Sequence, residues 1–275
     1  MRFSRLILPV TLLALPLGSV SADARALIPH RAVYDLALEN ASDRSGITGM
    51  SGRMVYEFNS SACDGYTVTF RFVTKIDTPD VSRVTDQQTT TYEDGDGKNF
   101  TFVTRSFVDQ ALDKELKGSA RLAQNATQVA LEKPEPQKLS LETTQFPTQH
   151  LLELLAKARA GETFYETTIY DGSEDGDKVM TTTVVIGRGA PAKTNDPEAK
   201  AIAPIAKDSF WPVDIAYFDL SDNQADGEEL PSYRISFKLH ESGVTRDLLM
   251  DYGDFSMTGT LVDLSMFDPV DCAKE

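Results

Sequence analysis

The residues that could do chemistry in this chain are few and far apart. They are three histidines, His30, His150 and His240, and two cysteines, Cys63 and Cys272. The histidines fall in different expected elements without metal-ligand spacing, and the sequence after His240 does not continue into an HExxH zinc motif. No glycine-rich phosphate loop or other cofactor motif is present. The sequence therefore predicts a protein that is not an enzyme, with no catalytic, cofactor-binding or metal-ligating residues.

A serine nucleophile has no recognisable setting in this chain. Residues 172–176 read Gly-Ser-Glu-Asp-Gly, which places the serine wrongly for a GxSxG nucleophile elbow. A Ser–His–Asp triad can assemble from distant residues without any local motif. A hydrolase therefore stays open as an alternative.

Two acidic turns resemble the start of a calcium loop. Asp171, Ser173, Asp175 and Gly176 match its first positions, but position twelve, which needs a bidentate glutamate, is Thr182. The second turn has the same start in Asp222, Gln224, Asp226 and Gly227, and its position twelve is Tyr233. Ordinary hairpin turns are the better interpretation of both.

The N-terminus has the three parts of a secretion signal. Residues 1–5 carry two arginines, residues 6–18 are almost entirely apolar, and residues 19–22 read Ser-Val-Ser-Ala, a cleavage site of small residues. The apolar stretch is shorter than the roughly 20 residues that a membrane-spanning helix needs. We expect residues 1–22 to be a signal peptide, cleaved after Ala22 or, alternatively, after Ala26.

Two cysteines in an exported protein usually form a disulfide. Cys63 lies in a turn-like stretch between two strand patterns, and Cys272 lies near the C-terminus. A bridge between them would close a loop of about 200 residues, which in the chain-entropy model stabilises the fold by roughly 4–5 kcal/mol. Two free thiols or a redox pair are the alternatives, although redox pairs are usually closely spaced.

The charge balance limits the classes of partner. The formal net charge is -15, and 41% of the residues are hydrophobic, which is enough to bury a core. A surface this acidic repels nucleic acids and anionic lipid headgroups at long range. We therefore expect no nucleic-acid partner.

Strict alternation of apolar and polar residues dominates the chain. In residues 66–72, Tyr66, Val68, Phe70 and Phe72 alternate with polar side chains, a period that indicates strands with one buried face. Turn signals such as Asp226-Gly227 separate the segments. The other segments with this pattern are 32–39, 50–58, 85–92, 99–107, 115–122, 127–132, 163–170, 178–186, 213–220, 232–239, 244–252 and 255–267. The sequence predicts one large antiparallel sheet, curled or partly closed.

One helix and one loop interrupt the strands. Leucines and Ala158 recur at helical spacing in residues 151–158, with Thr148 as the expected N-cap and Gly161 as the expected C-cap. We expect this helix to cover one face or opening of the sheet. Residues 187–207 contain three prolines among alanines and charges, and they read as an exposed, mobile loop within one domain.

An ordered set of sequence blocks resembles the EipB family of periplasmic envelope-integrity proteins of alphaproteobacteria. The blocks cover essentially the whole chain after the signal, and together with both cysteines they are fairly specific. They are residues 27–36 (LIPHRAVYDL), 52–58 (GRMVYEF), 63–66 (CDGY), 146–150 (FPTQH), 210–212 (FWP) and 267–272 (FDPVDC).

The resemblance implies an all-β, mainly antiparallel fold: a monomeric β-spiral, or incomplete overlapping barrel, with one packed α-helix. Residues 23–275 would form a single β-spiral domain with the exposed loop near 187–207. The resemblance also implies a disulfide between Cys63 and Cys272, a periplasmic location and no established catalytic activity.

The leading functional hypothesis is a non-enzymatic periplasmic protein that maintains cell-envelope integrity under stress. Its expected partners are periplasmic or outer-membrane envelope proteins, or wall components such as peptidoglycan, held by strand edges or by the concave face. The second hypothesis is a periplasmic carrier of lipids or lipoproteins, because a curved sheet covered by a helix can hold acyl chains. The envelope-polymer hydrolase is the third.

Overall fold

A computed structural model describes residues 27–61, 65–193, 195–219 and 230–268. Fifteen strands in these residues join in one sheet. The first eight are β1 (His30–Ala41), β2 (Gly49–Ser61), β3 (Gly65–Asp77), β4 (Ser82–Glu93), β5 (Asn99–Val108), β6 (Ala111–Leu122), β7 (Thr127–Lys133) and β8 (Gln137–Leu141). The others are β9 (Phe164–Ile169), β10 (Met180–Ile186), β11 (Ala190–Pro191), β12 (Ser209–Phe218), β13 (Tyr233–His240), β14 (Thr245–Asp251) and β15 (Phe255–Met266).

Two runs of neighbouring strands meet at the middle of the sheet. The first half runs in sequence order from β8 back to β1, and the second runs from β15 back to β12, β10 and β9, with β11 beside β12. The two halves are joined where β1 pairs with β15 along almost its whole length. Every strand-to-strand pairing is antiparallel, as the alternating pattern predicts.

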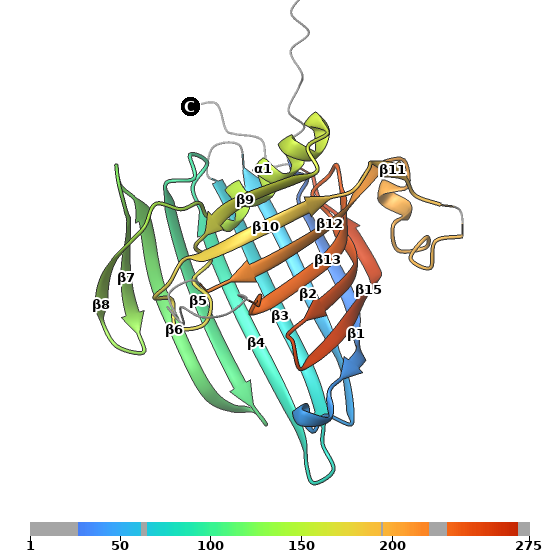
Figure 1. The fold of residues 1–275 in the computed structure, drawn as a ribbon, viewed down its shortest axis with the longest axis horizontal. Helices are drawn as coiled ribbons and strands as arrows, with labels where there is room; N and C mark the ends of the chain where they lie inside the picture. The colour runs from blue at the N-terminus through green and yellow to red at the C-terminus, as the bar shows by residue number, and fades with distance from the viewer. Residues whose placement is uncertain (1–26, 62–64, 194, 220–229, 269–275) are drawn as a thin grey trace, which may run out of the picture.

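The sheet curls over itself without closing. Strands β8 and β9 end the order of hydrogen-bonded strands. Figure 1 shows β9, β10, β12 and β13 crossing in front of β2–β5. The overlap is sealed by side chains, because Tyr170 and Gly172, which follow β9, pack on Phe100 and Phe102 of β5. The expected incomplete, overlapping barrel with one packed helix is therefore confirmed.

Two hydrophobic cores fill the curl. The main core lies between the inner faces of β1–β3, β10 and β12–β15, and the second core lies over β5–β7. The second core contains Phe146, which is fully buried and stacks on Phe100 with ring centroids 5.2 Å apart. Aromatic packing of this kind stabilises the overlap beyond the burial of area alone.

The strand segments expected from alternation are all present, with ends that differ by a few residues. Two strands were not expected. β8 follows two prolines and has only five residues, and β11 has two residues and contains Pro191. Both are too short for a period of two to stand out.

Helix α1 (Pro147–Ala160) lies at one end of the curled sheet (Figure 1). It buries Leu154, Leu155 and Ala158 in the main core. Gly161 ends it in the left-handed conformation at φ 78°, as expected. The expected N-cap is wrong, because Phe146 occupies that position and Thr148 lies within the helix.

A carboxylate from another element caps the helix instead. Glu93, the last residue of β4, is 2% exposed, and its two oxygens accept hydrogen bonds from the backbone N–H groups of Thr148 (2.8 Å) and Gln149 (3.1 Å). Burial raises the pKa of Glu93, against the effect of these two hydrogen bonds. The contact fixes the start of α1 to the end of β4.

The expectation of an exposed loop at 187–207 is wrong for part of that segment. Glu198, Ile202 and Ile205 are buried, and Ile202 and Ile205 belong to the main core. Residues Ala203–Ile205 form a single 3-10 turn. The prolines and alanines give the segment the composition of a solvent-exposed loop. The side chains of Glu198, Ile202 and Ile205 nevertheless anchor it to the sheet.

Candidate functional site

A groove opens on the concave face of the sheet, near the hairpin that joins β3 and β4. It has a volume of about 320 Å³ and lies between β2–β6 on one side and Tyr252 with the start of β15 on the other. A second hollow of about 380 Å³ adjoins it, because Ile76, Thr85 and Val108 line both. The interior of the curl is therefore not completely filled by side chains.

The groove has one apolar wall and one polar wall. Met50, Phe72, Phe255 and Met257 contribute apolar and aromatic surface. The polar wall is the inner face of β4 and β5, which continues the sheet beside Phe72 of β3. In this wall Thr85 pairs with Val108 and Gln87 pairs with Ser106.

Threonine side chains on the inner face are paired with one another. The hydroxyls of Thr74 and Thr85 are 2.6 Å apart, and those of Thr89 and Thr104 are 2.9 Å apart. Because each hydroxyl already has a partner, this wall offers fewer hydrogen bonds than its composition indicates.

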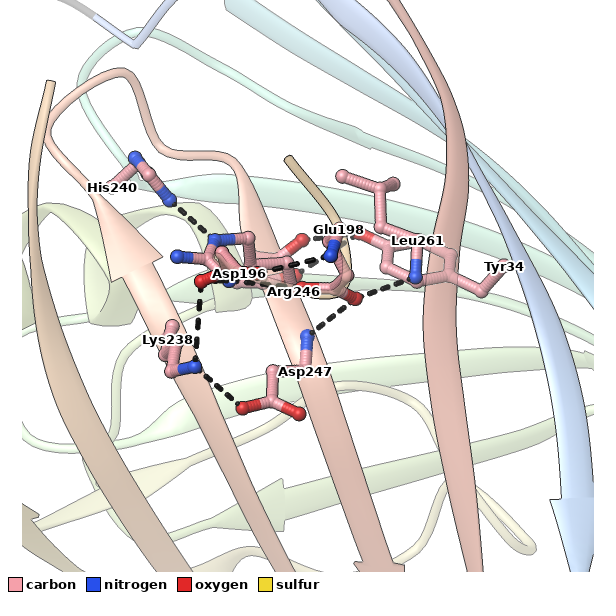
Figure 2. Close-up of polar contacts among 9 residues, drawn as sticks. Tyr34, Asp196, Glu198, Lys238, His240, Arg246, Asp247 and Leu261 are labelled. Atoms are coloured by element: carbon pink, nitrogen blue, oxygen red, sulfur yellow. Dashed lines mark hydrogen bonds and ion pairs between the residues drawn. The ribbon is translucent and has the colours of Figure 1, made fainter. Parts of the chain in front are cut away.

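A buried charge cluster lies elsewhere, where the segment before the 3-10 turn at Ala203–Ile205 contacts β13–β15. We call Asp196, Glu198, His240 and Arg246 the Arg246 cluster. Arg246 is 0% exposed, and its Nη1 lies 2.9 Å from Asp196 Oδ2 and 3.0 Å from Glu198 Oε2. Its Nε donates to His240 Nε2 at 2.8 Å (Figure 2).

Glu198 also satisfies backbone groups where the strand ladders are irregular. Its Oε1 accepts hydrogen bonds from the N–H of Asp247 (3.1 Å) and of Leu261 (2.6 Å). The register of β13 with β14 shifts opposite Asp247, and that of β1 with β15 shifts beside Leu261. Bulges leave N–H groups without a strand partner, and the carboxylate supplies one.

The charges in the Arg246 cluster are close to balanced. Lys238, at its edge, lies 3.8 Å from Asp196 and 2.8 Å from Asp247 (Figure 2). Burial and the nearby Arg246 charge lower the pKa of His240 to about 4, so its imidazole is neutral at pH 7 and accepts the Arg246 hydrogen bond. The cluster anchors the segment, because Glu198 bonds to Arg246 and to the backbone of two strands at once.

The other two histidines are also buried, at 2% exposure for His30 and 5% for His150. Nδ1 of His30 donates to the Ile28 carbonyl at 2.7 Å. Burial lowers the pKa of His150 to about 4. All three histidines are therefore core residues, and they lie in different parts of the fold, in β1, α1 and β13.

The first acidic turn has partners within the protein. The Asp171 carboxylate accepts the Ser173 N–H at 2.8 Å, and the Asp175 carboxylate lies 2.6 Å from Lys114 Nζ. Within the described ranges, no three His, Cys, Asp or Glu side chains form a group that could hold a metal ion. The second acidic turn, at Asp222–Gly227, lies outside the described residues.

Cys63 and Cys272 and the signal segment, residues 1–22, also lie outside the described residues. Their disulfide and the cleavage site stay predictions. The Arg246 cluster was missed by the sequence reasoning, since its members are up to 50 residues apart. The only signal was a pair of acidic residues, Asp196 and Glu198, in a segment otherwise rich in alanine and proline.

These features define a class: proteins built on one curled, unclosed antiparallel sheet with a groove on its concave face. The family model described as EipB-like matches residues 21–268. The chain belongs to this family, which confirms the resemblance carried by the sequence blocks.

Two comparisons lead to Brucella abortus, one with a sequence and one with a solved structure. The chain is 55% identical over 249 residues to the "Cell envelope integrity protein EipB" of strain 2308, covering 90% of this chain and 87% of that protein. A crystal structure described as a "Beta-barrel-like Protein of Domain of Unknown Function DUF1849" aligns with a TM-score of 0.84 and 54% identity. That alignment covers 88% of this chain and 99% of the other. Among the described residues, no helix is both long and apolar enough to span a bilayer.

Proposed function

We propose that this protein maintains cell-envelope integrity under stress, as a non-enzymatic periplasmic protein that binds an envelope component. The name of the Brucella relative supports the envelope role, because 55% identity over 90% of this chain makes a shared role the simplest expectation. The signal-like N-terminus supports a location outside the cytoplasm. The net charge of -15 disfavours nucleic acid as the bound component.

The observation that carries the binding proposal is the open groove on the concave face. A pocket of a few hundred Å³ with apolar walls is the usual form of a binding site, and the groove has a volume of about 320 Å³. The free sheet edge at β8 is a weaker candidate. It has only five residues and carries Lys138, features typical of edges protected against strand addition.

The groove also favours a second candidate function, a carrier of lipids or lipoproteins. A fully filled interior would have removed this candidate, and the interior beside Met257 and Phe255 is not filled. Both functions use the same face of the sheet and differ in whether the bound component is released elsewhere.

The test is a deletion strain challenged with detergent and with wall-targeting antibiotics. We expect the strain to become sensitive to both and the full-length chain, supplied in trans, to restore resistance. An export-blocked chain lacking residues 1–22 is the control, and it should not restore resistance. Unchanged sensitivity of the deletion strain would refute the proposed role.

A further inference from the structure

We propose that the concave groove binds a single alkyl chain of an amphiphile, such as a fatty acid, with its headgroup at the mouth beside Arg83. This rests on the proposed function and names the ligand class of the same face. The groove and the adjoining hollow share Ile76, Thr85 and Val108, and together they extend from the β3–β4 hairpin to the start of β15.

The apolar wall is suited to methylene groups rather than to polar polymers. Met50 and Met257 are buried beneath it, and methionine adapts its shape to irregular apolar ligands. Phe72 and Ile76 extend it to the mouth, where Val81 is 47% exposed. An exposed valine bordering an apolar groove continues the surface that a chain would cover.

The polar wall points to the same class of ligand. A sugar polymer is bound through many hydroxyl and amide partners, but the hydrogen bond between Thr74 and Thr85 at 2.6 Å already uses part of this wall's capacity and leaves mainly Gln87 and Ser106. An extended peptide needs free backbone groups, and this wall is the face of paired strands rather than an edge. An alkyl chain needs neither kind of partner.

The charge at the mouth sets where the headgroup lies. Arg83 faces the adjoining hollow, is exposed, and pairs with no carboxylate in the part of the chain that the structure describes. By contrast, the Asp86 carboxylate is already paired with Arg71 at 2.9 Å. Asp113 also lines the groove. Its negative charge repels an anionic headgroup, which favours a headgroup position beside Arg83. An unpaired arginine in an acidic protein complements a carboxylate or phosphate headgroup.

The experiment uses the complete mature chain, stripped of bound lipid, and the fluorescent fatty acid cis-parinaric acid. We expect saturable binding of one probe per chain, with competition by palmitate. Gln87→Trp places an indole over the groove, since Gln87 is exposed and lines it. It should weaken probe binding by about tenfold or more, because the alkyl chain loses the apolar space that it fills.

The matched control is Gln88→Trp. Gln88 is the next residue, is equally exposed and faces the opposite side of β4, so this variant should bind the probe as the wild type does. Arg83→Glu should weaken binding of the fatty acid by roughly threefold and leave binding of its methyl ester unchanged, as expected for a solvent-exposed ion pair. The circular dichroism spectrum of each variant separates loss of binding from loss of fold.

Three outcomes would overturn the proposal. These are no saturable binding by the wild type, equal loss in both tryptophan variants, or displacement by soluble peptidoglycan fragments or peptides but not by palmitate. The outcome is independent of the deletion-strain test. If the full chain fails to restore resistance while the probe binds as expected, the proposed function fails and the groove assignment stands.

Discussion

At the scale of single residues, the most consequential side chain is Arg246. It is fully buried, and it compensates two buried carboxylates and hydrogen-bonds a neutral histidine. Buried ion pairs add little net stability compared with a hydrophobic replacement of the whole group, but removing one partner leaves an uncompensated buried charge. We therefore expect a large loss of stability when one member of the cluster is substituted.

Arg246→Met should lower the free energy of unfolding by about 3–5 kcal/mol, because Asp196 and Glu198 would be left buried without their cation. Urea denaturation at pH 7 measures the change. Arg44→Met is the control, since the Arg44–Asp254 pair is largely exposed and should contribute less than about 1 kcal/mol. If Arg246→Met lowers the free energy of unfolding as little as the control does, the Arg246 charge does not stabilise the two carboxylates.

The buried histidines predict an acid-sensitive fold. Burial lowers the pKa of His150 and of His240 to about 4, below the ordinary value of 6.5. The unfolded chain therefore binds more protons than the folded chain between these values. Stability is fully present above pH 6.5 and is lost as the pH falls towards 4, by about 3 kcal/mol for each histidine.

Urea denaturation between pH 7 and pH 4 measures this loss. His150→Gln removes one of the two titrations, so the variant should show a flatter dependence on pH than the wild type. Identical slopes for the two proteins would mean that His150 is accessible to protons in the folded state.

At the scale of elements, the overlap of the sheet depends on close approach between the β9–β10 connection and β5. Gly172 has φ 66°, and a Cβ there would lie 2.7 Å from the Phe102 ring. Gly46 has the same φ of 66°, but a Cβ there would meet nothing within 4 Å. Alanine substitutions at the two positions therefore separate the cost of backbone strain from the cost of steric overlap.

Gly46→Ala should destabilise the fold by about 1 kcal/mol through the left-handed backbone alone. Gly172→Ala should destabilise it by about 2–4 kcal/mol, because the overpacking against Phe102 adds to the same strain. Thermal unfolding of both variants gives the comparison. Equal effects would indicate that the overlap can open without loss of stability.

Some of these elements and contacts could be predicted from the sequence, and others could not. Alternation predicted the long strands, because one face of each lies towards the interior, as in β15, where Met257, Gly259 and Leu261 are buried. It could not predict that Glu93 caps α1, because that contact joins residues 55 positions apart. It also misjudged the segment before β12, where Glu198 and Ile202 are held by partners that only the curl of the sheet brings near.

For the site, the sequence predicted an apolar strand face but could not separate a filled core from a groove. The same alternation of Phe70 and Phe72 fits both, and the difference depends on how far the sheet curls. Arg83 gave no signal at all, since its role depends on the apolar hollow beside it.

At the scale of the whole molecule, the predicted disulfide between Cys63 and Cys272 would close most of the chain. Cys63→Ser or Cys272→Ser should lower the stability by up to about 4–5 kcal/mol in the chain-entropy model. Thermal unfolding with and without reductant measures the effect, and intact mass shows whether the oxidised chain is lighter by two hydrogen atoms. A melting curve unchanged by reductant would show that the bridge is absent or does not stabilise the fold.

The pairing of β1 with β15 has a consequence for the order in which the protein can form. When the chain emerges N-terminus first, β1–β8 can form successive hairpins. One edge of β1 stays unpaired until residues 255–266 are available. Until then the partly formed sheet has a long unpaired edge at β1, which favours pairing with other chains. The last strand to be made is thus the one that protects the first.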